Sequence, residues 1–109
     1  MQSTRRLATT DNFKFLFSRG RRIESPLFRV VWLKNNLPLS RFAFVTSRAV
    51  SKRAVIRNRL RRRAKEWYGK QTEFFSAPVD IAVIFKKEAA GATRAEFYAE
   101  LKRATTQLL

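Results

Sequence analysis

The chain has 109 residues, of which 45% are hydrophobic and 29% charged, enough for one globular domain with a core of its own. Twenty-four Lys and Arg against eight Asp and Glu give a net charge of +16, which opposes compaction by self-repulsion and attracts a polyanion, nucleic acid first and a membrane surface second. Neither cysteine nor histidine is present, which excludes disulfides and thiolate metal sites and removes the commonest general base and metal ligand.

The start of the chain predicts a helix. Thr9 or Thr10 can cap it, and it ends near Ser18, before a glycine. Its aromatic residues Phe13 and Phe17 lie one turn apart on an apolar stripe. This segment has no apolar run typical of a signal peptide, and no stretch of the chain reaches the roughly 20 apolar residues that span a bilayer. We therefore expect a cytoplasmic protein.

Two strands follow the first helix. Leu27–Lys34 (LFRVVWLK) is rich in branched and aromatic residues, and Arg41–Ser47 (RFAFVTS) has a similar composition. The connecting segment Asn35–Ser40 (NNLPLS) contains residues typical of turns. The pattern predicts that the second strand returns antiparallel to the first.

The second half of the chain predicts a helix, a strand and a closing helix. A basic helix extends from a cap at Ser51 to about Tyr68, and Val79–Lys86 (VDIAVIFK) is apolar on both faces, as in an interior strand. Thr93 and Glu96 have the spacing of a capping box before the last helix. The fold class is therefore α+β (an α/β sandwich), with about three helices on a small mixed sheet, in one domain over residues 1–109.

The basic helix separates an apolar stripe from a cationic remainder. On a helical wheel, the stripe consists of Ile56, Leu60, Ala64, Trp67 and Tyr68. The rest is almost wholly Arg and Lys, without the acids that i, i+4 pairing would supply on an ordinary solvated face. This uncompensated charge costs stability, which indicates that it is kept for a partner. Arginine predominates, which favours bidentate recognition of phosphate.

The tripeptide Arg57-Asn58-Arg59, preceded by SRAVSKRAVI and followed by LRRRAKEWY, resembles the signature of the bacterial ribonuclease P protein subunit. The resemblance extends from about Leu7 to Leu108, because the order of helices and strands matches as well. It implies an α/β sandwich with a left-handed crossover, an exception to the usual right-handed rule. It also implies assembly with a catalytic RNA that removes 5′ leaders from precursor tRNA. The RNA, with its Mg²⁺ ions, would perform the hydrolysis, and no protein side chain would be catalytic.

The resemblance also implies two binding surfaces. The RNA subunit would contact the basic helix and the loop before it, through Arg48, Lys52, Arg53, Arg57, Asn58, Arg59, Arg61, Arg62 and Lys65. The single-stranded leader would lie in a cleft formed by Phe13, Phe17 and Trp32, since aromatic rings stack on any base. Two alternatives stay open, because the phenylalanines could simply pack the first helix and Trp32 could be ordinary core.

Two positions depart from the family pattern, and other functions remain to be separated. Ala49 stands where a second lysine is common in the family, which weakens the expectation that the loop before the basic helix contacts RNA as fully as in relatives. Ala43 stands at a strand position that is often glycine. A structural or ribosomal RNA-binding protein would share the charge without the aromatic cleft. A self-sufficient nuclease is disfavoured by the missing histidine and the eight scattered acids. A membrane-active protein would need one long amphipathic helix.

Overall fold

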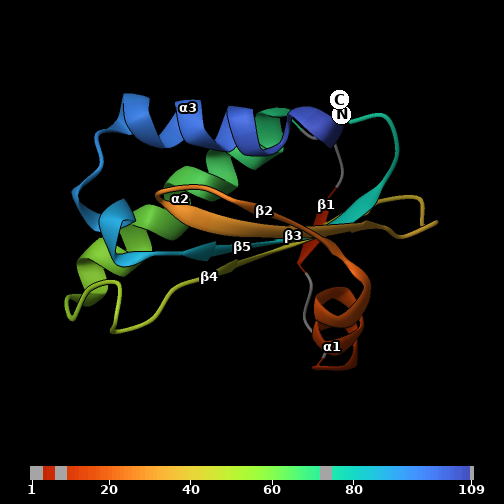
Figure 1. The fold of residues 1–109 in the computed structure, drawn as a ribbon, viewed down its shortest axis with the longest axis horizontal. Coiled ribbons are helices and arrows are strands. Elements are labelled where there is room, and N and C mark those ends of the chain that lie inside the picture. Colours follow the sequence, from red (N-terminus) through yellow and green to blue (C-terminus); the bar gives the residue numbers. More distant parts are fainter. Residues whose placement is uncertain (1–3, 7–9, 72–74, 109) are drawn as a thin grey trace.

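A mixed five-stranded sheet forms the middle layer of the computed structural model, which describes residues 4–6, 10–71 and 75–108 (Figure 1). The strand order is β1-β4-β5-β3-β2. The strands are β1 (Thr4–Arg6), β2 (Arg21–Glu24), β3 (Phe28–Lys34), β4 (Ser40–Val45) and β5 (Val79–Phe85). The helices are α1 (Thr10–Arg19), α2 (Ala54–Gln71) and α3 (Arg94–Ala104), with short 3-10 helices η2 (Lys87–Gly91) and η3 (Thr106–Leu108).

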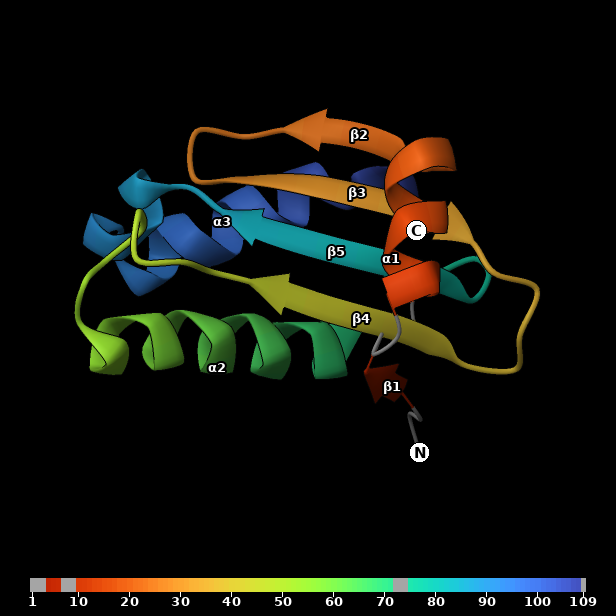
Figure 2. The same cartoon turned by 90° about the horizontal axis from the view of Figure 1, so that it is seen from below.

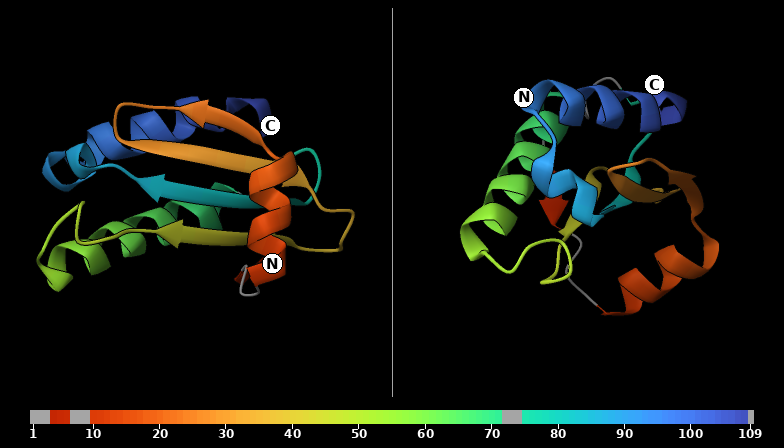
Figure 3. Two further views of the ribbon diagram at one scale, coloured as in Figure 1. Left: turned by 60° about the horizontal axis from the view of Figure 1, so that its bottom comes forward. Right: turned by 60° about the vertical axis from the view of Figure 1, so that its left-hand side comes forward.

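The helices cover the two faces of the sheet unequally. Figures 1 and 3 show α2 and α3 on one face and α1 alone on the other. Because side chains alternate along a strand, β3 supplies both layers: Phe28, Val30 and Trp32 point to α2 and α3, whereas Val31 points to α1. The α/β sandwich expected from the sequence is confirmed.

The larger core lies between the sheet, α2 and α3. Buried residues of α2 (Leu60, Ala64 and Tyr68) and of α3 (Phe97 and Leu101) meet the sheet there. The smaller core lies under α1, where Leu16 packs against Val31 and two alanines, Ala43 and Ala82. The small alanine side chains let the helix approach the strands closely, so the alanine at 43 is accommodated under α1.

The segment Arg41–Ser47 runs antiparallel to Leu27–Lys34 as predicted, but the two strands that they form, β4 and β3, do not pair with each other. β5 lies between them: it pairs antiparallel with β3 and parallel with β4. Its apolar residues on both faces suit this central place, which was predicted as an interior position. The connection from β4 through α2 to β5 passes behind the sheet in Figure 2, and its hand is left, as the resemblance implied.

The boundaries of the helices agree with the predictions at some ends and differ at others. The capping box of α3 is present: Thr93 Oγ1 accepts a bond from the Glu96 backbone N–H (3.1 Å), and Glu96 Oε1 accepts one from the Thr93 N–H (2.9 Å). Ser51 is not the cap of α2, which begins at Ala54; its hydroxyl closes a turn by accepting the Arg53 N–H at 3.2 Å. Thr9 lies outside the described residues.

Gly20 fixes the approach of α1 to the sheet. Its N–H donates to the carbonyl oxygen of Leu16 at 2.7 Å, at the end of the helix. A Cβ at this position would lie 2.5 Å from that same oxygen and 2.8 Å from Cγ1 of Val31 on β3. The backbone therefore comes so close to its neighbours that only glycine fits.

A nearly buried ion pair joins the central strand to its neighbours on the side of α1. Asp80 on β5 accepts hydrogen bonds from Arg41 Nε at 2.8 Å and Nη2 at 2.6 Å. The amide of Asn35 adds a third bond at 3.0 Å, and Asp80 hydrogen bonding raises the pKa of Arg41. The Asp80 side chain is only 9% exposed, so its charge depends on these partners.

Candidate nucleic-acid interface

Helix α2 is held to the sheet by one face and presents the other to solvent. Leu60, Ala64 and Tyr68 are buried, and Ile56 and Trp67 pack at the edge of the same core. The apolar stripe predicted from the sequence is therefore confirmed. The stripe leaves the cationic side chains on the outside of the molecule.

The loop before α2 places three further cations beside the start of the helix. Val50 is buried and anchors the loop, and its N–H donates to the Ser47 carbonyl at 3.0 Å. Arg48, Lys52 and Arg53 remain exposed. The first turn of α2 contains no acid, so the positive end of the helix dipole adds to this charge.

Two members of the Arg-Asn-Arg tripeptide hold neighbouring groups in place. Arg57 Nη1 donates to the Ser51 carbonyl oxygen at 2.9 Å and so joins the helix to the preceding loop. The Asn58 side-chain oxygen accepts a hydrogen bond from Arg61, one turn along. Arg59 is exposed on the helix surface. The tripeptide thus combines two positioning contacts with one outward-facing arginine.

The nine candidate RNA-binding residues lie on α2 and the loop before it. All nine reach solvent: Arg57 and Arg61 are half-buried and the others exposed. None of them takes part in an ion pair within the described part of the chain. Glu66, the acid of α2, lies instead 3.6 Å from Arg94 of α3. The charge of this surface is therefore left for an anion to neutralise.

Phe13 and Phe17 form a stacked pair on the side of α1 that faces the sheet. Their ring centroids lie 6.1 Å apart, with 14° between the ring planes. Both side chains are half-buried and pack against the smaller core. They therefore contribute to packing and keep part of their surface open.

The structure does not bring Trp32 to the two phenylalanines. Trp32 is 7% exposed and belongs to the core under α2 and α3, on the opposite face of the sheet. The guanidinium of Arg21 lies 5.7 Å from its ring centroid and covers it further. The prediction of one cleft containing all three rings is wrong, because Trp32 has the parity of Val30 along β3 and not that of Val31.

Residues on the uncovered part of the sheet were missed from the sequence. Figure 2 shows that α1 crosses the strands near one end only. Beyond it the same face carries Arg29 and Ile84, which lie opposite each other on β3 and β5. Lys86 and Arg29 both pair with Glu24, and their hydrogen bonds lower the pKa of that carboxyl. The alternation of side chains along β3 places Arg29 on the same face as Val31, but the sequence alone does not tell which face of the strand lies under α1.

Comparison with known proteins identifies the family. A profile described as Ribonuclease P matches residues 1–109. The chain belongs to the ribonuclease P protein family. It is 30% identical over 103 residues to the ribonuclease P protein component of Coxiella burnetii, covering 94% of this chain and 84% of the relative. To that of Petrotoga mobilis it is 28% identical over 104 residues, with 95% and 87% covered.

Solved ribonuclease P proteins share the fold. The protein from Staphylococcus aureus superposes with a TM-score of 0.85 at 20% identity, covering 94% of this chain and 93% of that one. The protein from Thermotoga maritima gives a TM-score of 0.83 at 23% identity, with 95% and 97% covered. As a ribonuclease P protein component, the chain is part of an RNA-processing enzyme whose ribonucleoprotein nature implies an RNA partner.

The acids among the described residues of this ribonuclease P protein do not gather into a metal site. Within residues 4–6, 10–71 and 75–108, no three metal-ligating side chains gather closely enough to hold an ion. Asp80 is committed to Arg41, and Glu96 to the cap of α3. Mg²⁺, which favours carboxylate oxygens, therefore finds no matching set among the described side chains. In the same residues, no helix has the length and apolar character to cross a membrane.

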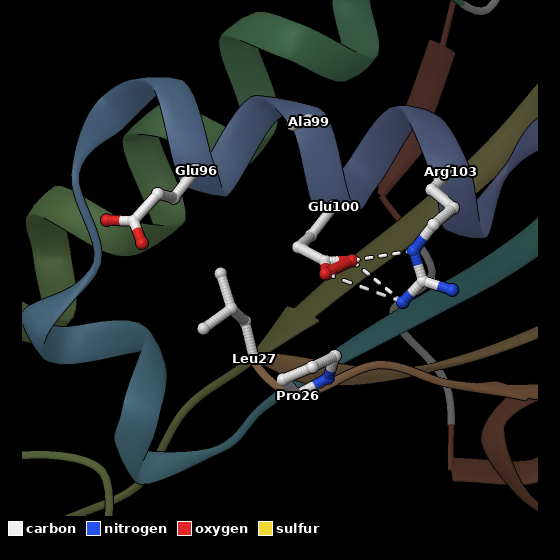
Figure 4. A pocket seen from close by; sticks show the side chains of 6 residues that line it. All are labelled: Pro26, Leu27, Glu96, Ala99, Glu100 and Arg103. Atoms are coloured by element: carbon white, nitrogen blue, oxygen red, sulfur yellow. Dashed lines mark hydrogen bonds and ion pairs between the residues drawn. The ribbon is translucent and has the colours of Figure 1, made fainter.

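A pocket beside α3 differs in its chemistry from the basic surface of α2. It lies between the turn before β3 and α3 and has a volume of about 450 Å³ (Figure 4). Two carboxylates, Glu96 and Glu100, line it beside Pro26 and Leu27. Arg103 pairs with Glu100 at 2.7 Å and leaves little free positive charge. The lining does not suit a phosphate group.

Proposed function

We propose that the chain binds the catalytic RNA of ribonuclease P through the basic surface of α2 and the loop before it. The observation that carries this proposal is the surface of nine candidate residues, in which no described side chain pairs with an acid. Phosphate groups would neutralise it, with release of counterions from the RNA. In this proposal Arg57 and Asn58, which bond to Ser51 and Arg61, would position their neighbours, and the exposed Arg59, Arg62 and Lys65 would contact phosphates.

The leader of precursor tRNA is proposed to bind on the other face of the sheet, beside α1. Phe13 and Phe17 offer the exposed edges of a stacked pair. The uncovered sheet face continues past them to Arg29 and Lys86, which would meet the phosphates of an extended strand. Arg29 replaces Trp32 in this proposed surface, because Trp32 lies in the opposite core.

In this division of roles the protein does not cleave RNA. Glu24, Glu66, Asp80 and Glu100 form ion pairs, Glu96 belongs to the cap of α3, and the chain has no histidine to act as a general base. Mg²⁺ would be held mainly by the RNA subunit, in the cytoplasm where precursor tRNA is made. The protein contributes binding of substrate and orientation of the RNA, which lowers the barrier through positioning.

The experiment compares precursor and mature tRNA binding by the reconstituted enzyme. Phe13→Leu and Phe17→Leu should each weaken precursor binding about fivefold or more and leave mature tRNA unaffected, because only the precursor has a leader to stack. Phe44→Leu is the matched control, since Phe44 is also half-buried but lies on the other face.

Three results would contradict the proposed function. Equal losses for precursor and mature tRNA would make the two rings ordinary core and favour a structural RNA-binding protein. Cleavage of precursor tRNA by RNA-free protein, retained through purification, would show that the protein carries the chemistry itself. Wild-type protein that fails to assemble with the RNA subunit would remove the basis of both surfaces.

A further inference from the structure

Helix α1 carries an aromatic side chain on its outer face as well as on its inner face. Phe15 lies between Phe13 and Phe17 in the chain, and because successive residues of a helix are 100° apart, it points away from the sheet. Its side chain is 54% exposed. Of the large hydrophobic residues that are exposed in the described part of the chain, Phe15 alone is aromatic. The ring contributes little to the smaller core under α1.

The exposed ring is paired with an arginine. Arg19 lies one turn along the helix, and its guanidinium carbon is 5.4 Å from the centroid of the Phe15 ring. Arg19 is itself exposed and forms no ion pair within the described residues. This cation–π contact holds the ring against the helix surface with one side covered and the rest open to solvent.

The surroundings of the ring are cationic. Lys14 is exposed next to it in the chain, and Arg22 is exposed just after α1. Arg22 is fixed in place, since its Nη2 donates to the Phe17 carbonyl oxygen at 2.6 Å. Asp11 is the one acid in the sequence of α1. A single exposed phenylalanine is common on protein surfaces, but one stacked by arginine and flanked by cations has the composition of a nucleic-acid contact.

We propose that the outer face of α1, formed by Lys14, Phe15, Arg19 and Arg22, is a second stacking surface for an unpaired RNA base and its flanking phosphates. The occupant is RNA because the charge is complementary to phosphate, whereas a second copy of a chain with net charge +16 is repelled. The inference rests on the proposed function only in taking RNA as the partner. Helix α1 would then contact RNA on two opposite sides.

The test measures the affinity of the free protein for a short single-stranded adenosine oligomer and for an abasic oligomer of equal length. Phe15→Leu should weaken binding of the adenosine oligomer about fivefold and leave the abasic oligomer unchanged, because only the base stacks. Arg19→Ala should weaken both, because it removes a phosphate contact as well. Leu37→Ala is the control: Leu37 is 41% exposed on the turn between β3 and β4, and its loss should change neither affinity.

Phe15→Tyr serves as a second variant, because it keeps the ring and should bind both oligomers as the wild type does. Circular dichroism of each variant checks that the fold is retained, as the exposure of Phe15 predicts. The proposal is overturned if Phe15→Leu binds the adenosine oligomer like the wild type, or loses equal affinity for the abasic oligomer. A concentration-dependent dimer that Phe15→Leu abolishes would also overturn it, in favour of a contact between copies.

These outcomes separate the inference from the proposed function. A loss of leader discrimination in Phe13→Leu, with no effect of Phe15→Leu on the adenosine oligomer, would leave the proposed function standing and remove the outer surface. A failure to assemble with the RNA subunit, with the Phe15→Leu effect intact, would do the reverse.

Discussion

Replacing Gly20 and Gly69 by alanine should change stability in opposite directions. A Cβ at Gly20 would lie 2.5 Å from the Leu16 carbonyl oxygen and 2.8 Å from Val31 Cγ1. The valine methyl can turn away, but the carbonyl belongs to the backbone and already accepts the Gly20 N–H. The last turn of α1 must therefore move from the sheet, and such overpacking costs about 1–3 kcal/mol. At Gly69 no atom beyond the adjacent residues and the helix's own backbone lies within 4 Å of the added carbon, so alanine should stabilise α2 by about 0.5–1 kcal/mol.

Urea unfolding followed by circular dichroism, at fixed salt, gives both free energies. For a domain of this size, 1 kcal/mol corresponds to a shift in Tm of roughly 4–8 °C, so the two variants should differ clearly in thermal melts as well. Gly20→Ala should also lower leader affinity, because Phe17 lies in the turn that has to move. The reasoning fails if Gly20→Ala is as stable as Gly69→Ala.

Four further predictions follow from charges and burial. Sulfate should raise the Tm relative to chloride at matched ionic strength, because an anion that binds only the native state stabilises it; an unchanged midpoint refutes this. Asp80→Asn should lower the free energy of unfolding, measured by urea titration, by about 2–4 kcal/mol, because it leaves the charge of Arg41 unpaired at a side chain that is only 22% exposed. Glu24→Gln, at a carboxylate that is 51% exposed, should leave the midpoint unchanged. Equal effects of the two variants would show that burial does not decide the cost. Arg59→Ala and Arg62→Ala should each reduce the slope of log affinity for the RNA subunit against log salt by about 0.7–0.9 without loss of helicity. Lys102→Ala on α3 should leave that slope unchanged. Unfolding of the two arginine variants would show that these side chains support the fold and do not bind RNA. Burial raises the pKa of Tyr68, an effect that the Ser40 hydroxyl partly offsets, so the native state keeps a proton that the unfolded state releases at high pH. Stability should therefore fall as the pH rises above about 10, the ordinary tyrosine value. Tyr68→Phe should reduce that fall in thermal melts between about pH 9 and 11.

The basic helix was predictable because its signal is local. The apolar stripe and the uncompensated arginines of α2 both follow from the 3.6-residue period of a helix, and neither depends on how the strands of the sheet pair. The capping box at Thr93 is local in the same sense. The cap at Ser51 was misplaced because a serine before a helix can equally close a turn, as its bond to the Arg53 N–H does.

The pairing of strands and the place of Trp32 depend on distant residues. The segment that forms β3 is apolar on both faces, so its pattern cannot tell which side meets α1 and which meets α2. Nor can a turn between β3 and β4 reveal that β5 enters between them. The edge strand β2 was missed because its sequence, RRIE, has a single apolar residue and depends on pairing with β3.

The central position of β5 has a consequence for synthesis of the chain. β3 and β4 are made first but have no direct contact in the sheet, because each pairs with β5. The α2 sequence is also translated before β5 (Val79–Phe85), so the sheet that buries the apolar stripe of α2 is incomplete until β5 has left the ribosome. β5 then links β3 to β4, and α3, which is translated after β5, completes the larger core, so folding is delayed to the end of translation.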